Sequence, residues 1–385
     1  MKISAMLRRY LPRWQVFDVL MKQLFLARCD RFLLPEEDVL QAEMDPACKK
    51  KVLEKCRKKW GAKYTNVKKE AALKIHEFGV DQNQEELIAD AVFCHFAYGF
   101  SADEYFAFQL ADKTIQERKQ YISDQYRTKL AIYLNDYFPM EIFLDKYKTY
   151  QYYQDAYKRD VICVFSEKDW DSFSAFYDNH SSFIKKRVDL ARGNSVELIS
   201  KDPTAEKKKE LFQSIISSGK CVLEEVIDQA EPLAVFHPAS VNTVRMITIW
   251  KDGKLDIPYC ILRTGRGSAV IDNASAGGIS AAIDPKTGVI STDGMDERNH
   301  IYAKHPDSDV VFKGYAIPEW DTLLDYIKEI VARYPGVVYV GWDLAYSKRG
   351  WCLVEGNHAP QVEARQVLCG GMKEEFDRII GGPLN

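Results

Sequence analysis

Hydrophobic and polar positions follow two different periods along the chain. From residue 1 to about residue 127, apolar residues return every three or four positions, which is the pattern of helices with one buried face. Asp45-Pro46 is a helix-start signal in this part, and the helix behind it carries lysines among its apolar positions. We therefore expect residues 1–138 to form a mainly helical region.

Beyond Pro139, helical and β-branched stretches alternate, which predicts a mixture of helix and sheet. Val161 to Phe165 has the pattern of a strand, and a helical stretch follows it. Further on, Asp252-Gly253 has the composition of a two-residue turn between two strands. We expect an α+β organisation in this part of the chain.

The stretch from Val337 to Asn357, VVYVGWDLAYSKRGWCLVEGN, has the pattern of a β-hairpin. Two runs of apolar, β-branched and aromatic residues flank Ser-Lys-Arg-Gly, in which the glycine suits a left-handed loop position. We expect a three-residue loop, Lys348 to Gly350, between the two strands.

Such a loop places Asp343 opposite Glu355, and Gly341 opposite Asn357. Directly opposed residues share a face of the sheet, so two carboxylates and an amide would meet beside a glycine that leaves room. Opposed carboxylates repel unless a cation lies between them, and a hard divalent cation takes oxygen ligands of this kind. Mg²⁺ binding is one interpretation. The alternative is a pair of exposed strand carboxylates, which a one-residue change of register would separate.

Basic residues gather at two other points of the chain. Lys185 and Lys186 end a strand and precede a loop around Arg192, an arrangement that can lay backbone N–H groups and an ammonium along a polyphosphate, although an exposed basic hairpin has the same pattern. Arg245 lies on the apolar side of its strand, with Ile247, and needs an anionic partner there. A structural salt bridge and phosphate binding both satisfy that need.

The composition is that of an ordinary globular protein, with 46% hydrophobic and 28% charged residues among 385. The net charge of −3 gives no global reason to expect nucleic acid as a partner. The nine cysteines form no CxxC pair, which favours reduced thiols and a cytoplasmic protein. Charged residues interrupt the first 30 residues, so no signal peptide or membrane span is expected, and an amphipathic helix touching a membrane surface is the alternative to a packed helix.

The order of these features resembles an ATP-grasp enzyme. More narrowly, the runs SVNTVRMITIW, RTGRGSAVIDNASAGGISAAID and GWDLAYSKRGWCLVEGN resemble the sugar-transfer-associated ATP-grasp family, over about Lys146 to Cys369. The resemblance implies an ATP-grasp fold, with two α+β subdomains that clamp ATP: a lid subdomain at 139–230 and a catalytic subdomain at 231–385.

The resemblance also implies roles for individual residues. Lys146 and Lys186 would contact the nucleotide phosphates, with Lys185 as a competitor for the second role. Glu224 would lie by the adenine amino group, with backbone groups beyond it pairing with the adenine edge. The implied cofactor-binding residues are Lys146, Lys185, Lys186, Arg192, Glu224, Glu225, Ile227, Asp228, Asn242 and Asn273.

The catalytic and metal-binding roles implied by the resemblance fall on the second subdomain and one lysine. Arg245 would neutralise the phosphoryl group in transfer, together with Lys186. Arg263, Arg266 and Asn273 are candidates for the carboxylate or sugar side, and each could equally be a structural residue at a strand end. Mg²⁺ would be held by Asp343, Glu355 and Asn357.

The implied activity is that of an ADP-forming carboxylate–amine ligase that works through an acylphosphate. Its substrates would be a small-molecule or saccharide carboxylate and an amine, with ATP and Mg²⁺ as cofactors, in cell-surface polysaccharide or related biosynthesis. The alternatives are an ATP-dependent phosphotransferase on the same scaffold and a non-catalytic ATP-binding module that serves a partner. The oligomeric state and the role of the helical region do not follow from the sequence.

Overall fold

The structure is a computed structural model that describes residues 13–81, 83–136, 139–188, 196–202, 204–269, 271–273, 277–334 and 336–384. The chain divides into two compact units. One comprises Met1–Phe138 with Gln361–Asn385, and the other comprises Pro139–Pro360.

The first unit is helical, as the apolar period of the sequence predicts. Asp45 caps a helix by accepting a hydrogen bond from the Ala47 amide, with Pro46 in the first turn. Ser101 forms a capping box with Glu104. The helices are α2 (Arg13–Cys29), α3 (Glu36–Met44), α4 (Pro46–Lys59), α5 (Gly61–Glu77), α6 (Gln84–Tyr98), α7 (Ala102–Ala107), α8 (Ile115–Lys119), α9 (Asp124–Leu134), α16 (Glu363–Cys369) and α17 (Lys373–Ile380).

Residues 361–384 belong to this helical unit. The buried side chain of Gln366 donates to the Ile122 carbonyl and accepts from the Ile122 amide. Tyr126 donates to the Asp377 carboxylate at 2.7 Å. The sequence assigned residues 361–385 to the catalytic subdomain, because nothing local to the segment shows that its partners lie more than 240 residues earlier.

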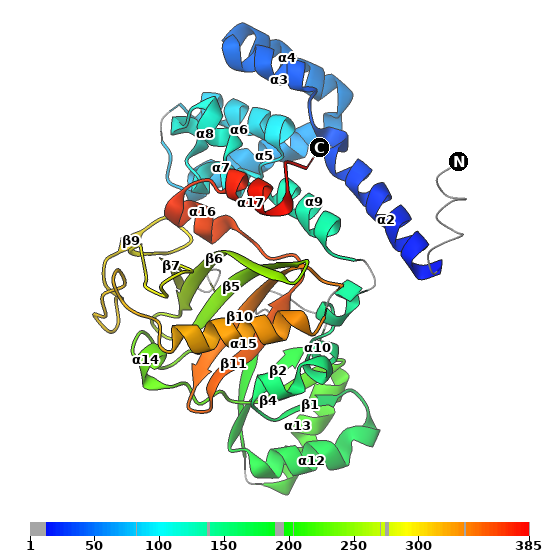
Figure 1. Ribbon diagram of the computed structural model, residues 1–385, viewed down its shortest axis with the longest axis vertical. Coiled ribbons are helices and arrows are strands. Elements are labelled where there is room, and N and C mark those ends of the chain that lie inside the picture. The colour runs from blue at the N-terminus through cyan, green and yellow to red at the C-terminus, as the bar shows by residue number, and fades with distance from the viewer. Residues whose placement is uncertain are drawn as a thin grey trace. The chain divides into compact units, whose positions relative to one another are not determined.

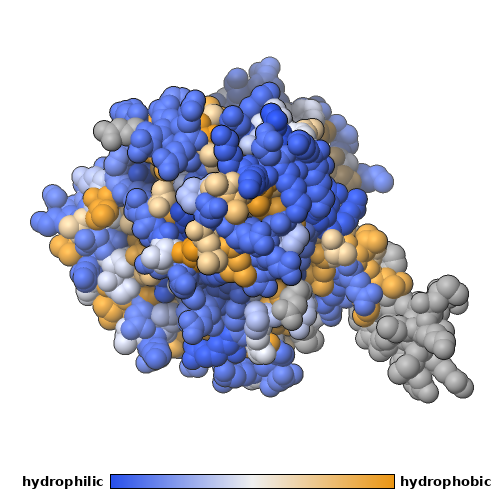
Figure 2. All heavy atoms as spheres, turned by 90° about the horizontal axis from the view of Figure 1, so that it is seen from above, coloured by the Kyte–Doolittle hydropathy of each residue, from blue (hydrophilic) through white to orange (hydrophobic). Residues whose placement is uncertain are grey.

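Figure 2 shows one face of the molecule on which hydrophilic residues dominate and hydrophobic ones form small groups. Leu20 and Leu24 of α2 are about half exposed, at 45% and 53%. Among the described residues, no helix is both long enough and apolar enough to span a membrane.

The second unit contains a four-stranded antiparallel sheet of order β1-β4-β2-β3. One face of this sheet packs against α12 and α13 through buried residues such as Phe173, Phe183, Phe212 and Leu223. The strands are β1 (Val161–Val164), β2 (Ser182–Arg187), β3 (Glu197–Ser200) and β4 (Cys221–Glu225), and the helices are α12 (Trp170–Asn179) and α13 (Ala205–Ser217), preceded by α10 (Lys146–Tyr152) and α11 (Gln154–Tyr157).

The larger sheet of this unit has seven strands in the order β11-β10-β5-β6-β7-β8-β9. The predicted turn at Asp252-Gly253 is confirmed, because Lys251 pairs with Lys254 across it. The strands are β5 (Thr243–Lys251), β6 (Lys254–Thr264), β7 (Ile279–Ile283), β8 (Gly294–Met295), β9 (Ile301–Tyr302), β10 (Tyr339–Ser347) and β11 (Gly350–Asn357), and the helices are α14 (Glu231–Ala234) and α15 (Trp320–Ala332).

Helix α15 covers one face of the seven-stranded sheet (Figure 1). Its apolar face is buried, with Leu323 and Ile327 fully inaccessible to solvent. Trp342 and Leu344 of β10 belong to the same core. Side chains alternate along a strand, so Asp343 and the residues paired with it lie on the opposite face of the sheet, away from this core. That face carries the charged residues considered next.

Candidate functional site

The hairpin of β10 and β11 brings Asp343 opposite Glu355 and Gly341 opposite Asn357, as predicted. The predicted three-residue loop is wrong, because Ser347 pairs with Gly350 and leaves a two-residue loop. A β-bulge accounts for both results. The register shifts by one residue between Asp343 and Leu344, where Val354 is the extra residue.

Gly341 does not leave room for a ligand. A Cβ atom at this position would lie 2.5 Å from Cβ of Pro360 and 2.9 Å from Cδ1 of Ile247. The glycine is therefore needed for the packing of Pro360 against the sheet.

Asp343 is buried between two arginines of neighbouring strands. The Arg245 guanidinium donates to both carboxylate oxygens, with Nε 2.7 Å from Oδ1 and Nη2 2.6 Å from Oδ2. Nη1 of Arg263 lies 3.3 Å from Oδ2. Burial raises the pKa of Asp343, but the charges of Arg245 and Arg263 outweigh burial and leave the pKa below its ordinary value. The anionic partner that Arg245 requires is therefore Asp343, in the absence of any ligand.

Glu355 and Asn357 are less constrained than Asp343. Oε1 of Glu355 lies 3.2 Å from Nζ of Lys146, the first residue of α10, and the Glu355 side chain is 37% exposed. The side-chain nitrogen of Asn357 is buried and has no hydrogen-bond partner among the described residues. These two side chains are thus available to a further ligand on this face of the hairpin.

The pairing of β2 separates the two candidate lysines. Lys186 faces the same side of the small sheet as Glu224, and its ammonium lies 3.0 Å from Glu224 Oε2. Lys185 faces the opposite side and pairs with Glu197 at 3.0 Å. The structure therefore brings Lys186, and not Lys185, to the side of Glu224.

Arg159 is a second cation on Glu224, and its side chain is almost fully buried. Its Nη2 lies 2.7 Å from Glu224 Oε2, while its Nη1 donates to the Leu353 carbonyl of β11 at 2.6 Å. Burial raises the pKa of Glu224, but the charges of Lys186 and Arg159 outweigh burial and lower that pKa to about 2. Glu224 is therefore a carboxylate at neutral pH.

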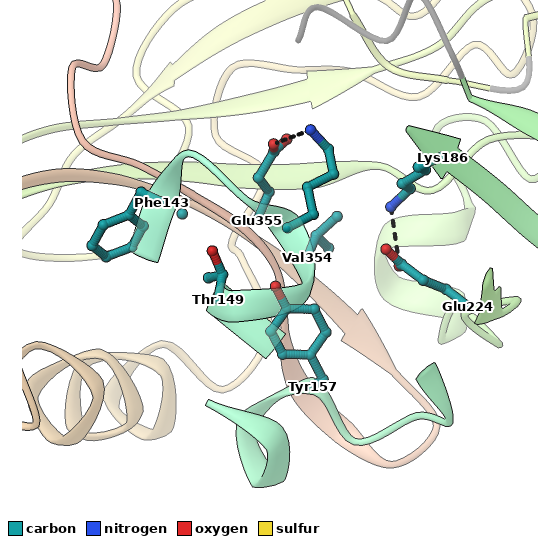
Figure 3. Close-up of a pocket in the computed structure, with 9 residues that line it drawn as sticks. Phe143, Thr149, Tyr157, Lys186, Glu224, Val354 and Glu355 are labelled. Atoms are coloured by element: carbon teal, nitrogen blue, oxygen red, sulfur yellow. Dashed lines mark hydrogen bonds and ion pairs between the residues drawn. The ribbon is translucent and has the colours of Figure 1, made fainter. Parts of the chain in front are cut away.

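The pairs Lys146–Glu355 and Lys186–Glu224 line one cavity. Figure 3 shows Glu355 joined to an amino group on one side and Lys186 joined to Glu224 on the other. Helix α10, the small sheet and the bulged strand β11 all contribute to its walls. The lining residues are Phe143, Lys146, Thr149, Tyr157, Lys186, Glu224, Val354, Glu355 and Gly356.

Glu225 and Asp228, two predicted nucleotide contacts, pair with residues at the tip of the β10–β11 hairpin. Arg349 donates to both oxygens of Glu225, at 2.7 and 3.0 Å. Lys348 lies 2.9 Å from the exposed Asp228 carboxylate. Ile227 lies in the connection after β4, between these two contacts. Their nucleotide roles stay predictions, and in this structure the two carboxylates hold the loop of the β10–β11 hairpin.

Arg263 lies at the centre of a buried network beside Asp343. Its Nη2 is 3.1 Å from Asp272 and also donates to Asn273. Thr243 donates to the second oxygen of Asp272. Burial raises the pKa of Asp272, and the nearby charge of Arg263 opposes that shift without cancelling it. Asn273 is thus placed beside Arg263, in the connection between β6 and β7.

Two other predicted residues, Arg266 and Asn242, lie apart from this network. Arg266 contacts Tyr302 and lies 3.3 Å from Asp296. Asn242 is fully buried, and its amide donates to the Leu233 and His237 carbonyls, which closes a local turn. Arg192 lies outside the described residues.

Arg159 and Asp272 were not among the residues that the sequence singled out. Arg159 stands directly before a strand in the run YKRDVICV, where a basic residue is usually solvated, and its partner Glu224 is 65 residues away. The one available signal for Asp272 was its place beside Asn273 in a glycine-rich loop. In both cases the chemistry depends on tertiary pairing, which local pattern does not reveal.

The donors on the hairpin fit Mg²⁺. A carboxylate offers about four acceptor positions, and three arginine N–H groups take three of those on Asp343, which leaves one on Oδ1. Glu355 adds a half-exposed carboxylate. Turning the Asn357 amide exchanges its nitrogen and oxygen, which would place an acceptor where the structure has an unpartnered donor. Oxygen donors of this kind suit Mg²⁺.

A second group of metal-ligating side chains lies at one end of the small sheet. Ligand atoms of Asp160, His180 and Glu225 all lie within 4.8 Å of one another. The Arg349 guanidinium already neutralises Glu225, and Asp160 is exposed. We therefore place no metal there.

The family model described as sugar-transfer associated ATP-grasp matches residues 125–377. No curated protein sequence matches the chain. Among solved structures, D-alanyl-alanine synthetase A from Vibrio cholerae is 9% identical, with 68% of this chain and 73% of that chain covered and a TM-score of 0.42. The ATP-grasp ligase PsnB complexed with minimal precursor is 12% identical, with coverages of 69% and 70% and a TM-score of 0.40. N5-carboxyaminoimidazole synthetase from Staphylococcus aureus, complexed with ADP, is 12% identical, with coverages of 63% and 53% and a TM-score of 0.38.

Proposed function

Because the chain belongs to the sugar-transfer associated ATP-grasp family, we propose that it is an ATP-dependent carboxylate–amine ligase that releases ADP. The observation that supports this proposal most strongly is the cavity with a lysine–carboxylate pair on each side, Lys186 with Glu224 and Lys146 with Glu355. Two ammonium groups in one small cavity suit a polyphosphate, which would replace the carboxylates as their partner.

The nucleotide would lie between the two sheets of this unit. Glu224, which lines the cavity, would accept from the adenine amino group, with backbone groups of Glu225 and Ile227 along the adenine edge. Lys146 and Lys186 would contact the phosphates. Arg245, which lies beside Asp343, would neutralise charge on the phosphoryl group in transfer.

Mg²⁺ would be held by Asp343, Glu355 and Asn357. When bound, the ion would neutralise the negative charge of the nucleotide phosphates. The protein's own contribution is positional, because the bulged hairpin orients the carboxylates and the two arginines fix Asp343 in its ionised form. No side-chain nucleophile is required, since positioned charge accounts for most of the catalysis of phosphoryl transfer.

The proposed reaction has two steps. A carboxylate oxygen of the first substrate attacks the γ-phosphorus, and the bond from that phosphorus to ADP breaks, which yields an acylphosphate and ADP. The nitrogen of an amine then attacks the acyl carbon and phosphate leaves, while the amine loses a proton to solvent. Arg263 and Asn273 would face the acid, and the family's association with sugar transfer supports a saccharide acid such as a uronic acid.

The test is an ADP-release assay with Mg²⁺-ATP, a panel of uronic and amino acids, and a panel of amines. We expect ADP and phosphate in equal amounts, together with an amide product, with at least one pairing. ADP release with a phosphorylated product that persists in the absence of amine would establish phosphotransfer instead. Tight ATP binding without ADP from any pairing would contradict the enzyme proposal and favour a non-catalytic ATP-binding module.

A further inference from the structure

The bulge at Val354 decides which face of the large sheet carries Glu355. With a two-residue loop and no bulge, the pairing of Leu344 with Leu353 would continue as Asp343 with Val354 and Trp342 with Glu355. Opposed residues share a face, so Glu355 would then point with Trp342 into the apolar core. The extra residue restores Glu355, and Asn357 two positions later, to the face of Asp343.

A bulge leaves backbone groups outside the strand ladder, and these groups need other partners. Arg159 supplies them here. Its Nη1 lies 2.6 Å from the Leu353 carbonyl and its Nη2 lies 3.5 Å from the Val354 carbonyl. The other edge of the same guanidinium, Nε and Nη2, contacts Glu224.

We propose that Arg159 is a positioning residue that holds the bulge of β11. It thereby keeps Glu355 and Asn357 on the face of the large sheet that carries Asp343. Its side chain does not need to touch nucleotide or metal for this role. The planar guanidinium joins Glu224 to strand β11, which carries the proposed metal ligands Glu355 and Asn357. The metal-binding part of this inference rests on the proposed function, whereas the structural part does not.

The test combines substitution of Arg159 with deletion of Val354. Deleting Val354 removes the bulge but leaves Glu355 opposite Asp343, because the next residue takes the vacated position. Arg159→Met should therefore weaken metal binding, the deletion alone should preserve it, and the deletion should rescue Arg159→Met. Arg333→Met is the matched control, since Arg333 pairs with Asp155 and Glu329 on the surface of the same unit.

The first measurement is Mn²⁺ binding in the presence of ATP, followed by electron paramagnetic resonance. We expect Arg159→Met to weaken Mn²⁺ binding at least about tenfold, which is typical when a residue that orients metal ligands is lost. The double variant should regain most of that affinity. A folded Arg159→Met protein with unchanged Mn²⁺ affinity, or a folded double variant without rescue, would overturn the proposal.

The second measurement is hydrogen exchange of residues 351–357 without nucleotide or metal. Arg159→Met should speed exchange in this strand, and deletion of Val354 should restore protection. This arm remains informative if the wild-type protein binds no Mn²⁺-ATP, so failure of the proposed function is distinguishable from failure of the inference.

Arg159→Lys covers the case in which Arg159→Met does not fold. It keeps a positive charge next to Glu224, but one ammonium does not span both Glu224 and the Leu353 carbonyl as the guanidinium does. We expect it to fold, to exchange faster in β11 and to bind Mn²⁺ more weakly. Wild-type exchange and affinity in Arg159→Lys would contradict the proposed role.

Discussion

Each sheet of the Pro139–Pro360 unit holds one buried carboxylate between two cations, but the two clusters are built differently. Asp343 is bound by Arg245 of the adjacent strand and by Arg263 of the next strand in the same sheet. Glu224 is bound by Lys186 of its neighbouring strand and by Arg159, which also reaches the other sheet.

The Asp343 cluster therefore lies within one sheet, whereas the Glu224 cluster connects the two sheets. The partners of Asp343 are fixed by strand pairing, so its orientation follows from one sheet. Glu224 depends on Arg159, whose guanidinium also contacts strand β11 of the other sheet, and on Lys186, which we expect to bind phosphate. A ligand that binds Lys186 would therefore leave Arg159 as the partner of Glu224.

The largest expected effect is that of Asp343→Asn. Removing the charge leaves two buried arginines without an anion, which costs about 3–5 kcal/mol of unfolding free energy. We also expect turnover to fall at least about a hundredfold. Denaturant unfolding and ADP release measure the two losses.

Glu355→Gln is the control for Asp343→Asn, because its carboxylate is half exposed and pairs with one lysine. It should lose turnover to a similar extent but change the unfolding free energy by no more than about 1 kcal/mol. Equal losses of stability in the two variants would remove the contrast between the two carboxylates.

Glu224→Gln should show the next largest effect, and its size should depend on pH. The folded pKa of about 2 lies below the ordinary value of 4.5, so the ionised carboxylate stabilises the folded state above about pH 4.5. This contribution, about 3 kcal/mol, is lost as the pH falls towards 2. The stability difference between wild type and Glu224→Gln, measured by urea unfolding, should therefore shrink on acidification. A difference that does not change with pH would contradict the lowered pKa.

Lys186→Met and Lys185→Met test whether only Lys186, which lies on the cavity side of β2, contacts the nucleotide. Loss of one charge-assisted hydrogen bond to a phosphate should raise the KM for ATP about tenfold in Lys186→Met. Lys185→Met removes only the pair with Glu197 and should leave that KM nearly unchanged. Steady-state kinetics distinguish the two lysines, and equal KM values would show that strand parity does not decide the contact.

The smallest expected effect is that of Arg349→Ala at the hairpin tip. Its pair with Glu225 is exposed, so the stability loss should stay within about 1 kcal/mol and decrease further in high salt. Urea unfolding at low and high salt measures this loss, with Lys348→Ala as a comparison. A larger loss would mean that the tip, and not Arg159, is the main contact between the two sheets.

The sequence predicted the helical region, the turn at Asp252-Gly253 and the opposition of Asp343 and Glu355. The opposition is correct although the loop is one residue shorter than expected, because the bulge adds the residue that the loop lacks. The local sequence pattern gives no sign of the bulge, because counting residues from the loop assumes that every residue of one strand has a partner in the other.

The sequence could not show which of the remaining candidates face the site, because strand pairing and contacts between distant segments decide this. Lys185 and Lys186 have opposite parity, and only the pairing of β2 with β4 shows which of them faces Glu224. Arg159 finds its partners 65 and 194 residues away, and Asn242 resembles a site residue in sequence but caps a buried turn. Contacts of this range depend on the assembled fold and not on neighbours in the chain.

The bulge also has a consequence for how copies of this protein meet. Strand β11 is the last strand of its sheet, and a flat, unpaired edge strand can recruit a strand from another molecule. The bulge distorts that edge, and the guanidinium of Arg159 covers the Leu353 carbonyl that an incoming strand would use. The geometry that keeps Glu355 opposite Asp343 thus also occupies a backbone acceptor at this edge of the sheet.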